Sequence, residues 1–182
     1  MSANISRRNF LRLSALGTSA LILPSSMTAS VAPAVNKSKK GSANDQINIG
    51  FIGLGQQAIH LMNGFITIPG VRIVAGCDVY DIKRNRFEQR VNKYYSEKKI
   101  KNKLSMYIRY EELLARPDID AVVIATPDHQ HAIMAIAACR AGKDIYLEKP
   151  VTFTVYEGQQ LIKAVRENCR ILQVGSMQRS MP

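Results

Sequence analysis

The sequence predicts an α/β fold in which helices cover both faces of a doubly wound, parallel sheet of about six strands. Short β-branched apolar runs alternate with longer amphipathic stretches from Ile47 onward. This alternation is typical of strand–helix units that form a parallel sheet. A Gly-x-Gly-x-x-Ala turn separates the first apolar run from the first amphipathic stretch. The length of 182 residues allows one such domain and a tail.

Each element is predicted from its hydrophobic period and its flanking residues. The apolar runs predict strands at 47–52, 71–77, 105–108, 120–126, 144–147 and 170–174. Amphipathic or polar stretches predict helices at 57–66, 80–97, 111–115, 129–141 and 155–167. Gly142 follows the fourth of these helices and is expected to end it, because glycine readily adopts the left-handed backbone conformation there.

Composition excludes several classes of protein. Hydrophobic residues make up 46% of the chain and charged residues 21%, as in soluble globular proteins rather than disordered ones. Three cysteines without a Cys-x-x-Cys spacing argue against a disulfide scaffold and a zinc ribbon. No apolar run approaches the roughly 20 residues that cross a bilayer, which excludes a multi-pass membrane protein.

The net charge of +11 is concentrated in two segments. Residues 1–44 contribute +6 and residues 83–109 contribute +8, so the remainder sums to −3. A basic segment is compatible with nucleic-acid binding. No aromatic stacking motif or helix-turn-helix spacing accompanies it here, so we expect a solvated helix face and no nucleic-acid partner.

The first 34 residues read as an export signal. Adjacent arginines, Arg7 and Arg8, precede Phe10, a short apolar stretch and a helix-breaking proline. The pattern resembles a twin-arginine signal and predicts a periplasmic protein; the alternative is a disordered basic tail. No cysteine follows that could carry a lipid, so no stable membrane anchor is expected. Residues 35–46 read as a polar linker, and 47–182 as the folded domain.

The glycine turn predicts a dinucleotide site. Gly53 permits a tight turn, Gly55 lets the backbone approach a pyrophosphate, and Ala58 allows close helix packing. Asp78 ends the second predicted strand, where a carboxylate can bind the adenosine ribose and repel a 2′-phosphate. NAD is therefore favoured over NADP, although Lys83 and Arg84 lie nearby. The alternative is a flavodoxin-like or other parallel sheet that binds no dinucleotide.

Two further polar clusters follow the fourth and fifth predicted strands. The first runs from Thr126 to His131 and the second is Glu148-Lys149-Pro150. Both are expected at the edge where doubly wound sheets bind ligands. Lys149 could contact a substrate oxygen or move a proton there; a surface ion pair is the alternative. His129 and His131 have no evident third ligand, so no metal site is expected.

Together these clusters resemble the glucose–fructose oxidoreductase, inositol dehydrogenase and rhizopine-catabolism (Gfo/Idh/MocA) family. The resemblance covers about residues 47–182 and implies a Rossmann domain that binds NAD. Its implied pyrophosphate contacts are Gly53, Gly55, Gln56 and Gln57. Asp78 is implied at the ribose, with Thr126, Pro127 and His131 at the cleft. The nicotinamide side is implied to include Glu148, the catalytic Lys149, Gln178 and Arg179.

The resemblance also implies an activity. It suggests an exported oxidoreductase that transfers hydride between nicotinamide and a sugar or cyclitol, and homo-oligomers in its full-length form. The second α/β domain of the family, which supplies the substrate pocket, is not found in this chain, so the sequence predicts nucleotide binding more strongly than turnover by the chain alone. The alternatives are an NAD-dependent glycosidase of the same fold and a non-catalytic dinucleotide-binding module.

Overall fold

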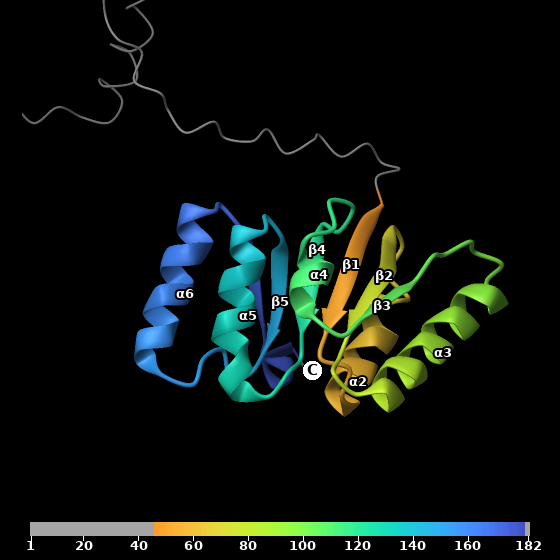
Figure 1. The fold of residues 1–182 in the computed structure, drawn as a ribbon, viewed down its shortest axis with the longest axis horizontal. Helices are drawn as coiled ribbons and strands as arrows, with labels where there is room; N and C mark the ends of the chain where they lie inside the picture. Colours follow the sequence, from red (N-terminus) through yellow and green to blue (C-terminus); the bar gives the residue numbers. More distant parts are fainter. Residues whose placement is uncertain (1–45, 181–182) are drawn as a thin grey trace, which may run out of the picture. The chain divides into compact units, whose positions relative to one another are not determined.

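The computed structural model describes residues 46–180, so the predicted signal and the linker residues 35–45 lie outside the described part. Six parallel strands form one sheet in the order β3-β2-β1-β4-β5-β6 (Figure 1). The strands are β1 (Ile47–Ile52), β2 (Val71–Cys77), β3 (Ser105–Tyr107), β4 (Ala121–Ile124), β5 (Asp144–Glu148) and β6 (Leu172–Gly175). The predicted fold class is confirmed.

Helices alternate with these strands. They are α2 (Gln56–Phe65), α3 (Asp81–Glu97), α4 (Tyr110–Leu114), α5 (Asp128–Arg140) and α6 (Val155–Glu167), followed by the 3₁₀ helix η1 (Met177–Ser180). A capping box between Thr154 and Glu157 starts α6. Within 46–180, no helix has the length and apolar character needed to cross a bilayer.

Helices cover both faces of the sheet, and successive strand residues serve opposite faces. Val123 packs in the cluster on the α2–α3 side, whereas its neighbours Val122 and Ile124 pack on the α4–α5–α6 side. Phe51 and Phe87 anchor the first cluster, with ring centroids 5.2 Å apart. Each such burial contributes roughly 1.5–3 kcal/mol. This two-sided burial explains why the strands read as continuous apolar runs.

The topology creates a switch point between β1 and β4. The chain passes from β1 outward to β2 and β3, then returns to pair β4 with the other edge of β1. The carboxyl ends of β1 and β2 point toward the lower edge of Figure 1. In such sheets ligands bind outside the carboxyl ends at this point, which places the candidate site before any side chain is considered.

Two strand boundaries differ from the prediction by two residues, and the others differ by at most one. β6 begins at Leu172 rather than at residue 170, because Cys169 adopts a left-handed turn (φ 51°) and the Arg170 amide still donates to Val165 O. β4 spans only Ala121–Ile124, two residues shorter than expected at its carboxyl end. The backbone beyond it turns away from the ladder to begin α5.

The end of α5 matches its prediction. Gly142 has φ +72°, its amide donates to Cys139 O, and the next amide, that of Lys143, donates to Ala138 O. These two bonds form a Schellman motif, in which a left-handed residue closes the last helical turn.

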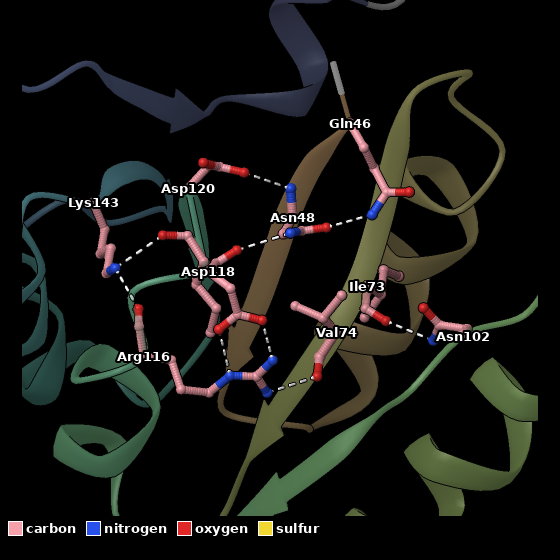
Figure 2. Close-up of polar contacts among 10 residues, drawn as sticks. Gln46, Asn48, Ile73, Val74, Asn102, Arg116, Asp118, Asp120 and Lys143 are labelled. Carbon is pink, nitrogen blue, oxygen red and sulfur yellow. Dashed lines mark hydrogen bonds and ion pairs between the residues drawn. The ribbon is translucent and has the colours of Figure 1, made fainter. Parts of the chain in front are cut away.

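A polar network closes the amino end of the sheet (Figure 2). Lys143 is 6% exposed, and its Nζ donates to Arg116 O at 2.6 Å and to Ile119 O at 2.9 Å. Arg116 pairs with Asp118 and donates a hydrogen bond to Val74 O. The backbone N–H of Asn48 donates to the Asp120 carboxylate. Burial lowers the pKa of Lys143, although the nearby carboxylates act against that shift. The network ties β1, β2 and β4 together at this end.

Candidate functional site

A cavity of about 770 Å³ lies at the carboxyl ends of β1, β2 and β4. Its walls include seven of the predicted cofactor residues: Gly53, Gly55, Gln56, Gln57, Asp78, Thr126 and Pro127. The fold therefore brings together the glycine turn, the acid after β2 and the segment after β4. His131, Glu148 and Lys149 lie outside this lining.

The glycine turn is shaped for close approach of a ligand. Gly53 has φ +81°, and a Cβ there would lie 2.7 Å from Ala125 O, so a larger residue is excluded. A Cβ on Gly55 would meet no protein atom within 4 Å. Gly55 caps α2 without a side-chain acceptor for the first helical amides. These amides and the open space beside Gly55 suit a phosphate group.

Asp78 is buried at the end of β2, with its carboxylate held in place by backbone. Leu54 N–H donates to Oδ2 at 2.8 Å, and Tyr80 N–H donates to Oδ1 at 3.0 Å. Lys83 Nζ lies 3.8 Å from Oδ2. A carboxylate has about four lone-pair sites, so both oxygens can still accept bonds from ribose hydroxyls.

Two arginines of α3 donate hydrogen bonds to backbone carbonyls of the glycine turn and of Asp78. Arg86 donates to Leu54 O at 3.0 Å, so the Leu54 residue is fixed through its N–H by Asp78 and through its C=O by Arg86. Arg84 donates to Asp78 O at 2.7 Å. Neither arginine was among the predicted site residues. For Arg86, nothing in the local spacing points to a backbone partner 32 residues away.

Apolar side chains line the cavity beside Asp78. Val79, Tyr80 and Ile108 are well exposed, and Lys83 Nζ lies 4.5 Å from the centroid of the Tyr80 ring. Such a wall suits a flat aromatic base. Ile108 was predicted as a strand residue and not as part of the site; its position at the carboxyl end of the strand next to β2 was the signal that could have found it. Burial raises the pKa of Cys77, in the same wall, to about 12.

In the segment after β4, the Thr126 hydroxyl has no hydrogen-bond partner among the described residues, whereas the Thr126 carbonyl is hydrogen-bonded. Thr126 Oγ1 is buried and has no hydrogen-bond partner among the described residues, so it can still bond a ligand. The Thr126 carbonyl lies 2.9 Å from His131 Nε2, and Pro150 O lies 2.6 Å from His131 Nδ1. His131 is only 1% exposed. His131, which was predicted at the cleft, therefore links the segments after β4 and β5 through these two contacts.

The Glu148-Lys149-Pro150 segment follows β5. Glu148 is 3% exposed and accepts a bond from Gln57, which does line the cavity. Lys149 is exposed, and its ammonium makes no ion pair within residues 46–180. Arg179 lies in η1 and is exposed; Gln178 belongs to the same turn, and its side chain lies outside the described part.

Comparison with known proteins identifies the family to which this fold belongs. Residues 47–176 match the model of the GFO_IDH_MocA oxidoreductase family with an NAD-binding Rossmann fold. A glycosyl hydrolase family 109 protein of Shewanella baltica is 32% identical over 186 aligned residues, covering 93% of this chain and 39% of the relative. An alpha-N-acetylgalactosaminidase of Shewanella oneidensis is 31% identical with the same coverage.

Solved structures show the same domain. A 3-ketoreductase from Actinomadura kijaniata, in complex with TDP-benzene and NADP, superposes with a TM-score of 0.66 at 26% identity, covering 76% of this chain and 39% of that one. A myo-inositol 2-dehydrogenase from Lactobacillus plantarum shares the fold, with a TM-score of 0.65 at 24% identity, covering 75% of this chain and 38% of that one. This chain spans about two fifths of the length of these relatives. On the motif order, the cavity and the match over 47–176, the chain belongs to the GFO/IDH/MocA oxidoreductase family with an NAD-binding Rossmann fold.

Proposed function

We propose that this chain is the dinucleotide-binding part of an oxidoreductase that transfers hydride between nicotinamide and a sugar or cyclitol. The observation that carries the proposal is the cavity that unites the glycine turn, the held carboxylate of Asp78 and the orphaned Thr126 hydroxyl. The substrate class is supported by the neighbours, among them a myo-inositol 2-dehydrogenase.

In this proposal each residue has a defined task. Gly55 and the amides of Gln56 and Gln57 bind the pyrophosphate, and Asp78 accepts bonds from the ribose. The nicotinamide, when bound, supplies the hydride acceptor or donor. In the oxidation direction the neutral amine of Lys149 accepts the substrate hydroxyl proton as hydride leaves the carbon, and in the reverse direction its ammonium returns that proton to the oxygen. The side chain is exposed and pairs with no carboxylate within the described range.

We further propose NAD as the preferred cofactor. The Asp78 carboxylate is held toward the ribose position, and it would repel a 2′-phosphate. Lys83, 3.8 Å from the same carboxylate, offsets part of that repulsion. Some NADP binding is therefore expected.

A binding experiment on the full chain tests the proposal. NADH titrated into the protein and followed by fluorescence should give saturable binding in the micromolar range. Asp78→Ala should weaken that binding by roughly tenfold or more, since the ribose loses its charged acceptor. Absence of NADH binding at high micromolar concentration, with a folded protein by circular dichroism, would refute it.

A glycosidase of the same fold is the second candidate. It is favoured by the family 109 and alpha-N-acetylgalactosaminidase names of the curated relatives. Such an enzyme oxidises the sugar transiently and regenerates its cofactor. Cleavage of a chromogenic N-acetylgalactosaminide by the encoded protein without NADH accumulation would favour it, whereas NADH accumulation with a free polyol would favour the dehydrogenase. Binding of NADH without either reaction would indicate the non-catalytic module.

We also propose export through a twin-arginine pathway, from the Arg7-Arg8 pair that precedes Phe10. Residues 1–46 fused to a reporter that is active only after export of its folded form should carry it to the periplasm. The paired substitution Arg7→Lys and Arg8→Lys should abolish transport. Unchanged transport would assign this leader to another route.

A further inference from the structure

A part-buried hydrogen bond between the half-buried Gln57 and the buried Glu148 joins two elements that are distant in the sequence. Gln57 lies in the first turn of α2, and its Nε2 donates to Glu148 Oε1 at 2.9 Å. Glu148 is the last residue of β5 and only 3% exposed. An amide–carboxylate bond at such depth is stronger and more orienting than one in water.

The carboxylate is enclosed on its other sides by backbone. Lys149 N–H donates to Oε2 at 3.2 Å. A Cβ on Gly175, where β6 ends, would lie 2.8 Å from Oε1. Gln57 Nε2 also lies 3.5 Å from Met177 Sδ in η1. Among the side chains that the structure describes, Gln57 is the one that donates a hydrogen bond to Glu148.

The order of the strands indicates which part of a dinucleotide this pair would serve. Asp78 ends β2 and Gly55 follows β1, whereas Glu148 ends β5, two strands farther along the sheet. A dinucleotide with its ribose at Asp78 and its pyrophosphate at Gly55 therefore extends toward β4 and β5. The Gln57–Glu148 pair lies on the nicotinamide side of the phosphate turn.

We propose that Gln57 is a positioning residue: its carboxamide fixes the buried Glu148 carboxylate, and the fixed pair is required for recognition of the nicotinamide half of the cofactor. This inference rests on the proposed function. Without the amide, the carboxylate would keep only the Lys149 backbone donor, and a buried charge lacking donors reorients or draws in water. The dinucleotide motif assigns position 57 a backbone role only.

Exchange of the two side-chain types tests this directly. Gln57→Glu places two carboxyl groups in contact, Glu148→Gln places two amides in contact, and the double substitution restores an amide–carboxylate pair with reversed polarity. NADH and ADP-ribose, which lacks the nicotinamide ring, are titrated into each variant of the full chain at pH 5.5 and pH 8. Gln56→Glu serves as the charge-matched comparison, since it adds the same charge to the same turn.

Few titratable groups other than Glu148 lie on the elements around the pair, so the difference between pH 5.5 and pH 8 can be assigned to it. The other titratable side chains on the adjoining elements are Asp144 and Tyr146 on β5, Lys149 after it, His60 on α2 and Arg179 on η1. Asp144 lies at the amino end of β5, where its carboxylate accepts a hydrogen bond from Ile171 N–H and pairs with Arg170. Burial raises the pKa of Tyr146, with the Glu148 charge acting in the same direction, so the phenol stays neutral over this range. His60 is exposed and present in every variant, so comparison with the Gln56→Glu protein cancels its contribution.

We expect Gln57→Glu to bind NADH nearly normally at pH 5.5, where the two carboxyls share a proton, and roughly tenfold more weakly at pH 8. The affinity for ADP-ribose should fall less. The double substitution should recover NADH affinity to within about threefold of the original, whereas Glu148→Gln should not rescue Gln56→Glu.

Each failure has a separate meaning. If the original chain binds neither ligand, the proposed function fails and the inference with it. If the original chain binds NADH but the exchange does not rescue, or if NADH and ADP-ribose weaken equally, only the inference is overturned. Should Gln57→Glu not fold, Gln57→Met replaces it: a selective loss of NADH affinity supports the pair, and an unchanged ratio of the two affinities overturns it.

Discussion

The two ends of the sheet use their polar groups in opposite ways. At the amino end, the charged side chains of Lys143, Arg116 and Asp120 are committed to backbone or side-chain partners across β1, β2 and β4. At the carboxyl end, a hydroxyl is orphaned on Thr126, and an ammonium is exposed on Lys149. Polar groups that the fold satisfies stabilise it, and those that it leaves free are available to a ligand.

This contrast separates two lysines that the sequence presents alike. Lys143 precedes β5 and Lys149 follows it. The first is buried and bonds two carbonyls, whereas the second is exposed. Position at one end or the other of a parallel strand therefore decides whether a lysine is structural or a candidate for catalysis.

The largest expected effect is the difference in stability between alanine substitutions at Gly53 and at Gly55. Gly53→Ala forces a Cβ to 2.7 Å from Ala125 O at a positive φ, and should lower the free energy of unfolding by at least about 2 kcal/mol. Gly55→Ala meets no protein atom and should leave stability within about 0.5 kcal/mol while weakening NADH binding. Urea unfolding and NADH titration measure the two quantities. Equal effects of both substitutions on stability would contradict the preformed turn.

The amino end should affect stability without affecting the cofactor. Lys143→Met leaves Arg116 O and Ile119 O without their donor and should cost roughly 1–3 kcal/mol of unfolding free energy. NADH affinity, measured on the folded protein, should not change. A parallel loss of affinity would show that the two ends of the sheet are coupled.

Alkaline pH should probe the wall of the cavity through Cys77. Because its pKa in the folded protein is raised to about 12, the thiol stays protonated after the unfolded chain has ionised at roughly pH 8.5. The unfolded state then binds fewer protons, so the Cys77 contribution to stability falls as pH rises from about 8.5 toward 12, by at most about 1.4 kcal/mol per pH unit. Cys77→Ala should remove this slope in urea titrations at successive pH values. An unchanged slope would place the thiol in water.

The smallest effect should come from Lys83. Lys83→Met removes the cation beside Asp78 and should weaken NADPH binding by roughly threefold, as expected for a partly exposed charge. NADH binding should stay the same or improve slightly. The ratio of the two dissociation constants is the measurement, and a larger loss for NADH would mean that Lys83 serves the shared part of the cofactor.

Most of the fold and half of the site could be predicted from local sequence. The apolar runs gave all six strands because parallel strands are buried on both faces, and Gly53, Gly55 and Asp78 follow from their place at strand ends. The long-range hydrogen bonds that hold the site together could not be predicted. Arg86 lies 32 residues from the carbonyl that it bonds, and Gln57 lies 91 residues from Glu148. Such contacts depend on packing angles that no spacing encodes.

The two hydrogen bonds that fix the Leu54 backbone have a consequence for the rate at which a ligand binds. With its N–H bonded to Asp78 and its C=O bonded to Arg86, the peptide groups on either side of Leu54 cannot rotate freely. The conformational entropy of the turn is therefore lost when the chain folds, not when the cofactor binds. Association should proceed at a rate set by diffusion rather than by loop closure. The Leu54 amide should accordingly resist hydrogen exchange in the ligand-free protein as strongly as in the complex.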